Sequence, residues 1–184
     1  FILEIYKAKN TVFTTRDISL LLGETNSDIL KSKINYYVKR GGLKQLRRGI
    51  YAKGEYDIFE LATSIYTPSY ISLETVLQKE GVTFQYYQTI FVVSYLSREI
   101  VVDSHRIKIR KIKNSILLNP KGILTGGNYS IAAGERAFLD SLYLYKKYHF
   151  DNLDILDKEK IFELVKIYKH KNLKDIVEKL FKNA

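Results

Sequence analysis

The chain of 184 residues is 46% hydrophobic and carries 30 Lys and Arg against 20 Asp and Glu, a formal net charge of +10. This length suits one large domain or two small ones, and the apolar share is enough for a packed core, which excludes a disordered tail. The absence of cysteine excludes disulfides, thiolate nucleophiles and Cys-based zinc sites.

The charge balance favours a polyanionic partner, either nucleic acid or an anionic membrane surface. The alternative is the general basic drift of a Lys- and Ile-rich proteome. No apolar run approaches the ~20 residues that span a bilayer, and no signal-peptide pattern is recognised. We therefore expect a cytoplasmic protein without a membrane partner.

Two helices are predicted near the amino end. Thr14 and Asp17 can form a capping box at the start of a helix that Gly23 ends. Its expected buried side consists of Ile18, Leu21 and Leu22. Asn26 or Ser27 caps the second helix, which stops before Gly41-Gly42. Its apolar stripe follows helical spacing and consists of Leu30, Ile34, Tyr37 and Val38.

A basic ribbon follows the second helix. Residues 43–52 alternate enough for two short strands, with a turn near Arg47-Arg48-Gly49. Helix, turn, polar-faced helix and basic hairpin, in this order, are the layout of a winged helix-turn-helix, which binds duplex DNA through its second helix and its wing. The natural boundary lies near Gly54-Glu55, so we expect domains at 1–54 and 55–184.

The second domain is predicted to be mixed α/β, which makes the whole chain α+β. Helices are expected at 57–65, 73–80 and 135–148, and strands at 89–94, 99–102 and 106–112. Ser72 is the expected cap of the 73–80 helix, and helix 135–148 is apolar around most of its circumference, which indicates a central position. Two amphipathic helices end the chain, with Asn172 as the expected cap of the last. Their stripes are Ile161, Leu164, Val165 and Tyr168, and Leu173, Ile176, Val177, Leu180 and Phe181.

Candidate DNA contacts come from the two helices and the ribbon. The polar face of the second helix carries donors suited to base edges in the major groove, and these are Asn26, Ser27, Lys31, Ser32, Asn35 and Lys39. At the start of the first helix, Thr15 and Arg16 are expected at the DNA backbone. Phosphate or minor-groove contacts are expected from Lys44, Arg47, Arg48 and Lys53. The alternative is an ordinary solvated helix face beside a charged hairpin.

A second basic patch lies on a predicted strand and consists of Arg106, Lys108, Arg110 and Lys111. It could extend the DNA footprint, face an acidic partner, or be a solvated strand face. Most of the 15 tyrosines lie at core spacing, which favours packing over stacking on single-stranded nucleic acid.

Catalytic patterns are weak. His105, His149 and His170 lack metal-ligand spacing, and Glu135 and Asp140 do not share one helix face. Asp103 could begin a nuclease-type acidic set, but the strand after it offers no second acid. We therefore expect no enzymatic activity, no metal and no cofactor.

Three segments together resemble AbiEi-type antitoxins. Arg47-Arg-Gly-Ile-Tyr-Ala52 resembles their wing-to-linker segment, and Pro68-Ser-Tyr-Ile-Ser-Leu-Glu-Thr-Val-Leu77 resembles the start of their second domain. Ile131-Ala-Ala-Gly-Glu-Arg-Ala-Phe-Leu-Asp-Ser-Leu-Tyr143 resembles their central helix, where Pro more often stands at the position of Gly134. The resemblance spans nearly the whole chain.

The resemblance implies an antitoxin of a type IV toxin–antitoxin system, a setting of abortive infection and phage defence. Its winged helix would bind inverted repeats at its own promoter as a repressor, with a homodimer on DNA as one arrangement. Its second domain would neutralise a nucleotidyltransferase-like toxin, AbiEii, without a stable complex. Two rivals stay open. One is a plain winged-helix regulator whose second domain senses a ligand or dimerises, and the other is a nuclease.

Overall fold

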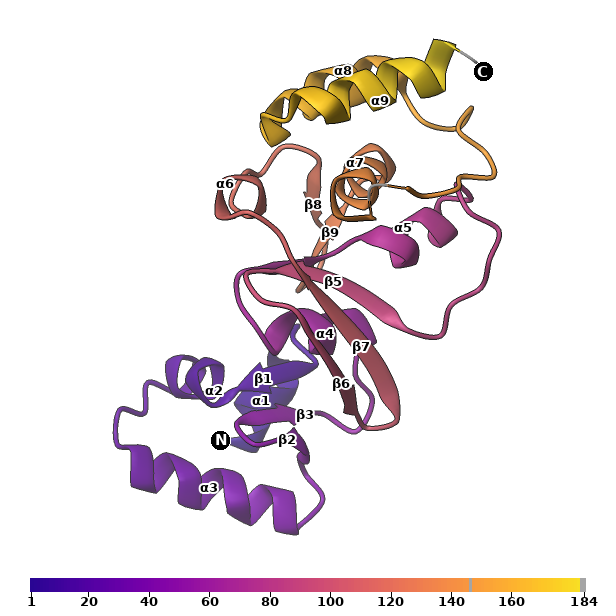
Figure 1. The fold of residues 1–184 in the computed structure, drawn as a ribbon. Coiled ribbons are helices and arrows are strands. Elements are labelled where there is room, and N and C mark those ends of the chain that lie inside the picture. Colours follow the sequence, from indigo (N-terminus) through magenta and orange to yellow (C-terminus); the bar gives the residue numbers. More distant parts are fainter. Residues whose placement is uncertain (146, 183–184) are drawn as a thin grey trace.

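The computed structural model describes residues 1–145 and 147–182. The first part of the chain contains α1 (Ile2–Lys7), β1 (Val12–Thr14), α2 (Thr15–Leu22), α3 (Ser27–Lys39), β2 (Lys44–Arg47) and β3 (Ile50–Ala52). The three strands form an antiparallel sheet in the order β1-β3-β2. This order of elements and strands is that of a winged helix-turn-helix, and it forms the lower end of the molecule in Figure 1.

Local capping sets the two predicted helices of this module. Thr14 Oγ1 accepts from the Asp17 amide over 3.1 Å, and Asp17 Oδ2 accepts from the Thr14 amide over 2.7 Å, so the capping box is confirmed. Asn26, rather than Ser27, caps α3 through two backbone amides. Gly23 ends α2 in the left-handed region at φ 62°, where glycine carries no steric penalty.

A small core holds the module together. It consists of Ile5, Phe13, Ile18, Leu30, Ile34, Leu43 and Tyr51. The expected buried side of α2 is partly wrong, because Leu21 is 41% exposed and Leu22 only half-buried. Helix α1 and strand β1 were not predicted from the sequence. They are short, and each depends on a distant partner, as where Phe13 lies opposite Tyr51.

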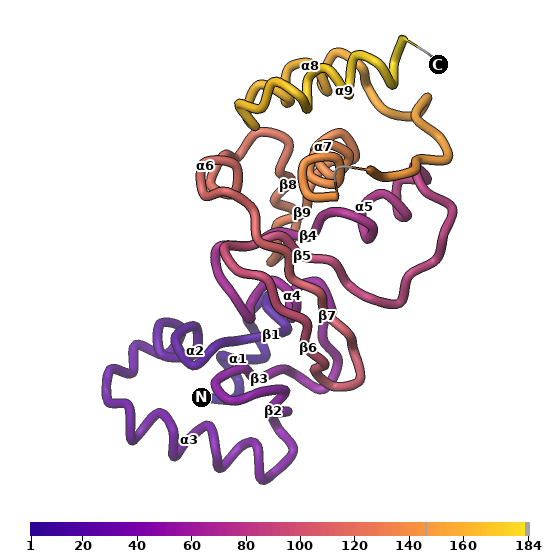
Figure 2. The backbone as a smooth tube through the Cα atoms, viewed as in Figure 1, coloured from indigo at the N-terminus to yellow at the C-terminus, as the bar shows by residue number. Residues whose placement is uncertain are grey.

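The remaining elements are α4 (Ile58–Ser64), β4 (Ser69–Ile71), α5 (Leu73–Lys79), β5 (Ile90–Ser94), β6 (Arg98–Val102), β7 (His105–Lys111), α6 (Asn114–Leu117), β8 (Ile123–Thr125), β9 (Ser130–Ala132), α7 (Gly134–Tyr145), α8 (Lys158–Leu164), a 3₁₀ turn (Val165–Tyr168) and α9 (Lys171–Lys182). Six strands form a mixed sheet in the order β6-β7-β5-β4-β9-β8. The chain is therefore α+β, as predicted. The tube in Figure 2 shows the β6–β7 hairpin reaching from this sheet toward β2 and β3, while α8 and α9 lie at the opposite end.

Three local expectations in this part are wrong, the first of them only in part. Ser72 is the N-cap residue of α5, as expected, but its hydroxyl donates to Asp140 and makes no capping hydrogen bond. Helix α7 ends at Tyr145, earlier than expected. Helix α9 begins at Lys171, and His170 Nδ1, rather than Asn172, accepts a first-turn amide.

Other expectations hold. Helix α7 is central and largely buried. All four residues of the stripe from Ile161 to Tyr168, which runs over α8 and the 3₁₀ turn after it, are buried. In the stripe of α9, Leu173 and Val177 are buried and the others half-buried. None of the helices in the described part of the chain combines the length and the apolar character of a membrane span.

Candidate nucleic-acid interface

The outer face of α3 is the first part of the candidate interface. Leu30 and Ile34 turn inward and are at most 3% exposed, so the opposite side of the helix faces solvent. Lys31, Ser32, Asn35 and Lys39 are all exposed there. Lys31 lies 3.7 Å from Asp28, and both side chains are well exposed. Such a surface pair contributes little, so the lysine can exchange it for a phosphate.

At the start of α3, the side chain of Asn26 caps the helix. Asn26 Oδ1 already accepts two amides, which leaves only its amide nitrogen for a partner. The Ser27 hydroxyl lies 3.5 Å from the Asp28 carboxylate. These two residues are therefore weaker candidates for base contacts than Ser32 and Asn35, for which the structure gives no side-chain hydrogen bond among the described residues.

The wing turn is the second part. Gly49 adopts φ 78°, which permits the tight turn between β2 and β3. Its carbonyl accepts from the Thr15 amide over 3.0 Å, so the beginning of α2 is held against the wing. The Thr15 amide is thereby occupied, whereas Arg16 is exposed next to it. Arg48 is exposed at the turn and Arg47 is half-buried.

Two predicted DNA contacts have other partners instead. The Lys53 ammonium donates to the Ala8 carbonyl over 2.6 Å and to the Tyr6 carbonyl over 3.4 Å, at the C-terminal end of α1. Lys44 lies 2.6 Å from Asp103, in the turn between β6 and β7. Lys53 thus stabilises the helix end, and Lys44 joins the wing to the second sheet.

Asp103 is the anchor of that junction. Its carboxylate accepts from Lys44 and from the Tyr56 hydroxyl. The hydrogen bond from Lys44, followed by that from Tyr56, holds the pKa of Asp103 below its ordinary value. The acid that the sequence offered for a nuclease-type site is therefore engaged in an ion pair.

The predicted second patch splits between two environments. Arg106 pairs with Glu99 over 3.1 Å at the surface, and Lys111 is exposed. Lys108 and Arg110 are half-buried, with the guanidinium of Arg110 lying 4.8 Å from the ring centre of Tyr145. The patch is therefore a partly packed strand face rather than a uniform cationic strip.

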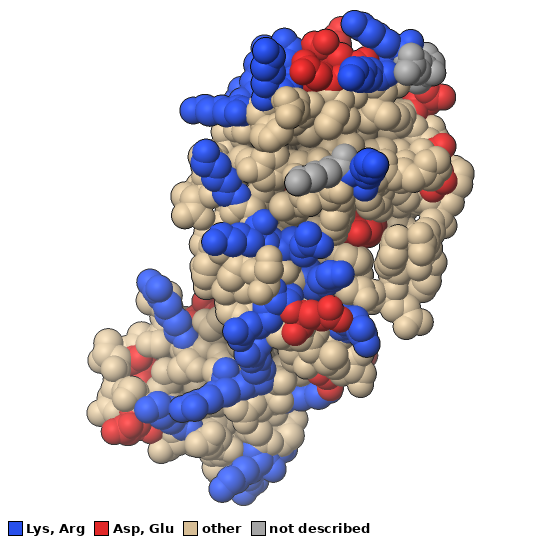
Figure 3. All heavy atoms as spheres, viewed as in Figure 1, with Lys and Arg blue, Asp and Glu red and all other residues tan. Residues whose placement is uncertain are grey.

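Cationic side chains nevertheless lie close to one another on the face of the molecule drawn in Figure 3. Figure 3 shows Lys and Arg following one another from α3, across the wing and the β6–β7 hairpin, toward α6. Two cations, one on α3 and one directly after it, were missed in the sequence. Arg40 lies over the Tyr36 ring at 5.1 Å, and Lys33 pairs with Glu24 over 3.1 Å, a hydrogen bond that lowers the pKa of Glu24. The Lys39-Arg40 run was the signal for Arg40.

A buried polar network lies away from this face. Arg136 and Asp140 on α7 are both fully buried. Asp140 accepts from the hydroxyls of Tyr70, Ser72 and Tyr168, and burial raises its pKa against the opposing effect of Arg136. Arg136 donates to carbonyls of the segment before β8, among them that of Lys121 over 2.6 Å. This network ties the sheet to α7 and offers no open reacting group.

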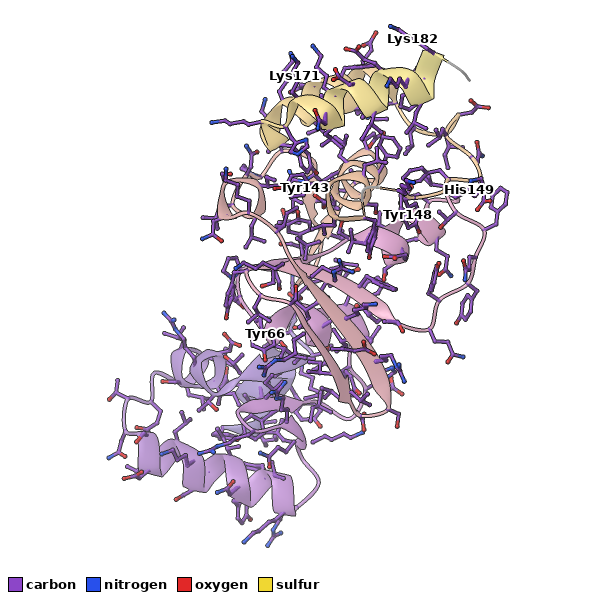
Figure 4. The ribbon with its side chains drawn as sticks, in the orientation of Figure 1. Tyr66, Tyr143, Tyr148, His149, Lys171 and Lys182 are labelled. Atoms are coloured by element: carbon purple, nitrogen blue, oxygen red, sulfur yellow. The ribbon has the colours of Figure 1, made fainter. Side chains whose placement is uncertain are left out.

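Two of the three histidines lie edge-on to tyrosine rings, His105 at 6.4 Å from Tyr56 and His170 at 5.9 Å from Tyr143, as measured between ring centres. Figure 4 shows His149 on the side of the C-terminal part and Lys171 and Lys182 at the two ends of α9. No group of three or more His, Asp or Glu side chains in residues 1–145 and 147–182 is arranged to hold a metal ion. Tyr168 is core, as expected, whereas Tyr37 and Tyr145 are half-buried and stack on Phe1 and Tyr148.

A scan with protein-family models finds no match to the chain, and a search of curated proteins finds no relative. Function is therefore inferred from the geometry above and from the three resembling segments.

Proposed function

We propose that the protein binds duplex DNA through the outer face of α3 and the β2–β3 wing, and that it represses transcription from its own promoter. One observation carries this proposal. The winged helix-turn-helix core leaves Ser32 and Asn35 unengaged on the exposed side of α3, next to a projecting turn with exposed Arg48. A helix of this kind enters the major groove while cations on the hairpin hold phosphates.

The expected footprint is smaller than the sequence suggested. Lys44 and Lys53 are engaged within the protein. The exposed cations on α2, on α3, directly after α3 and at the wing turn are Arg16, Lys31, Lys33, Lys39, Arg40 and Arg48. Of these, Lys33 also pairs with Glu24 over 3.1 Å. An inverted-repeat operator would engage two copies of the chain, one on each half-site.

Fluorescence anisotropy with a duplex from the upstream region of the gene, and with a shuffled duplex of equal length, tests the proposal. Asn35→Ala should cost about 1–3 kcal/mol on the upstream duplex and little on the shuffled one. Asn172→Ala is the matched control, because Asn172 is also exposed on a helix but lies at the far end of the molecule. Equal binding of both duplexes, unchanged by Asn35→Ala, would refute sequence-specific recognition.

We also propose that the chain acts as an antitoxin toward a nucleotidyltransferase-like toxin. This part rests on the resemblance to AbiEi-type antitoxins. One contact joins two of the three resembling segments in the structure. Ser72 of the segment 68–77 donates to Asp140 of the segment 131–143 over 2.8 Å. Growth rescue by the full chain, when a toxic neighbouring nucleotidyltransferase gene is expressed from an unrelated promoter, tests it. A plain regulator would not restore growth.

A further inference from the structure

A hollow lies between the loop that leads into β5 and the turn between β6 and β7, two segments that can be followed in Figure 1. Its volume is about 580 Å³, within the range of ligand pockets, roughly 300–1,000 Å³. The loop and the turn meet because β5 and β7 are parallel neighbours whose first paired residues are Ile90 and Ile107. The residues that line the hollow are Tyr86, Gln88, Thr89, Ser104, His105 and Arg106.

The lining residues are accessible to a ligand. Tyr86 is 73% exposed, and the other five are exposed or half-buried. Within residues 1–145 and 147–182, Arg106 alone among the six makes a side-chain hydrogen bond, which it donates to Glu99 over 3.1 Å. The donors and acceptors of the other side chains are therefore available to a bound molecule.

The charges around the hollow favour an anion. Arg106 is the cation of the lining, and its guanidinium has further N–H donors besides the one that meets Glu99. Both side chains of that pair are well exposed, so the pair contributes little and can yield to a phosphate. Asp103 directly precedes Ser104, but its carboxylate is already paired with Lys44 over 2.6 Å. No acid belongs to the lining itself.

The remaining lining groups suit a planar polar ring. The largely exposed ring of Tyr86 offers a surface on which a nucleic-acid base can stack. The side-chain amide of Gln88 offers both a donor and an acceptor, as the edge of a base does. Tyr86 and Gln88 come from the loop, whereas the hydroxyl of Ser104 and the guanidinium of Arg106 come from the β6–β7 hairpin. The hollow therefore combines an aromatic ring with donors for a phosphate.

We infer that this hollow binds a nucleoside monophosphate, with its base on Tyr86 and its phosphate at Arg106. A simple anion would use the guanidinium and leave the aromatic ring without a role. A metal ion would need acids that the lining does not contain, and an apolar ligand would need more apolar surface than the single ring of Tyr86. The site does not depend on the proposed DNA binding.

An NMR titration of the full chain tests the inference, with AMP, GMP, CMP and UMP as the probes. At least one of them should give saturable shifts of the Thr89 and Ser104 amides. The matching nucleoside, which lacks the phosphate, and ribose 5-phosphate, which lacks the base, should each bind about fivefold or more weakly. A short single-stranded oligonucleotide carries the same groups, and it should bind the hollow no more tightly than the mononucleotide does.

Two variants address the two halves of the ligand. Tyr86→Ala should weaken binding of the mononucleotide by about fivefold or more, and Arg106→Gln should weaken it by about tenfold or more. Phe84→Ala is the matched control for the first, because Phe84 lies in the same loop and is 72% exposed but does not line the hollow. Arg98→Gln is the control for the second, because Arg98 is exposed on β6 outside the lining. Both controls should bind as the unaltered chain does.

Four results would each overturn the inference. These are the absence of saturable shifts at the two amides with every probe, equal binding of the nucleoside or of ribose 5-phosphate, tighter binding of the oligonucleotide, and unchanged affinity in Tyr86→Ala and Arg106→Gln. The substituted side chains are all exposed, so the variants should keep the fold. The comparison of probes on the unaltered chain decides the matter even if a variant does not fold.

Discussion

Arg48 and Lys53 flank the same short strand, yet they should respond differently to removal of their charge. Arg48 is exposed at the wing turn. Lys53 is half-buried, its ammonium lies within 5.8 Å of the ring centres of Tyr6 and Phe13, and it donates to the carbonyl of Ala8. Arg48→Ala should therefore weaken DNA binding without destabilising the fold. Lys53→Ala should destabilise the fold without weakening DNA binding.

The magnitudes follow from the partners. Each cation that neutralises a phosphate contributes about 0.9 to the slope of log K against log salt. Arg48→Ala should flatten that slope by about one, which corresponds to a three- to fourfold smaller loss of affinity between about 50 and 200 mM salt. Lys53→Ala should leave the slope unchanged but lower the free energy of unfolding by about 1–2 kcal/mol, since it removes donors at the end of α1.

Anisotropy with the upstream duplex over this salt range gives the slopes, and urea denaturation gives the stabilities. Lys171→Ala is the control for charge alone, because Lys171 lies on α9 at the opposite end of the molecule from α3 (Figure 4). If Lys53→Ala flattened the slope as much as Arg48→Ala, the ammonium of Lys53 would be meeting DNA, and its assignment to α1 would be wrong.

Two further outcomes concern the second part of the chain and its link to the wing. Tyr168→Phe removes a hydroxyl that donates to buried Asp140 over 2.6 Å, so the free energy of unfolding in urea should fall by about 1–3 kcal/mol; an unchanged midpoint would contradict this. The lowered pKa of Asp103 means that its carboxylate stabilises the fold above its unfolded pKa, near pH 4, and that this contribution is lost as pH falls toward the folded value. The Tm of Asp103→Asn should therefore lie below that of the unaltered chain at pH 7, and the gap should shrink as the pH falls below about 4. A constant gap would mean that the ion pair with Lys44 is not its cause.

Elements whose ends are set by nearby residues were predictable. The capping box at Thr14, the left-handed turn at Gly23 and the wing turn at Gly49 all follow from short-range chemistry, and the structure has them where the sequence placed them. Helix α1 and strand β4 were missed. Each is short, and each is stabilised by partners far along the chain, as where Ile71 pairs with Ile131.

The candidate interface shows the same division. The exposed face of α3 was predictable from helical spacing, because it depends only on which side of one helix is buried. The ion pair of Lys44 was not predictable, because its partner Asp103 lies 59 residues away in the sequence. The ion pair of Arg136 and Asp140 could have been predicted from the sequence. The two opposite charges lie four residues apart in a helix that was expected to be buried all round, where each charge needs a partner.

Gly134 marks a departure from the antitoxin pattern, in which Pro more often stands at that position. A Cβ there would lie 3.1 Å from Leu156 Cδ2 and close to Glu80. The loop before α8 therefore packs too closely on the start of α7 for a larger residue without a shift of Leu156. The glycine is explained by this contact rather than by the conformation of the helix start.

The expected boundary near residue 54 can be tested by truncation, and the apolar contacts that cross it predict the result. One face of the β1-β3-β2 sheet covers the small core, while Val12, Ile50 and Ala52 on the other face join the large core, at 2%, 6% and 0% exposure. Glu60 on α4 also binds Thr11 twice. A fragment of residues 1–54 would expose these groups.

Uncovering one valine and one isoleucine alone removes about 3–6 kcal/mol, which is comparable with the whole stability of a domain this small. A fragment of residues 1–66, which retains α4, should therefore be more stable than 1–54 by a few kcal/mol in urea denaturation followed by circular dichroism. Equal stability of the two fragments would show that α4 does not complete the winged helix and that the boundary at residue 54 is a true domain border. If 1–54 proves unfolded, its failure to bind DNA would say nothing about α3, and only point variants in the full chain can test that helix.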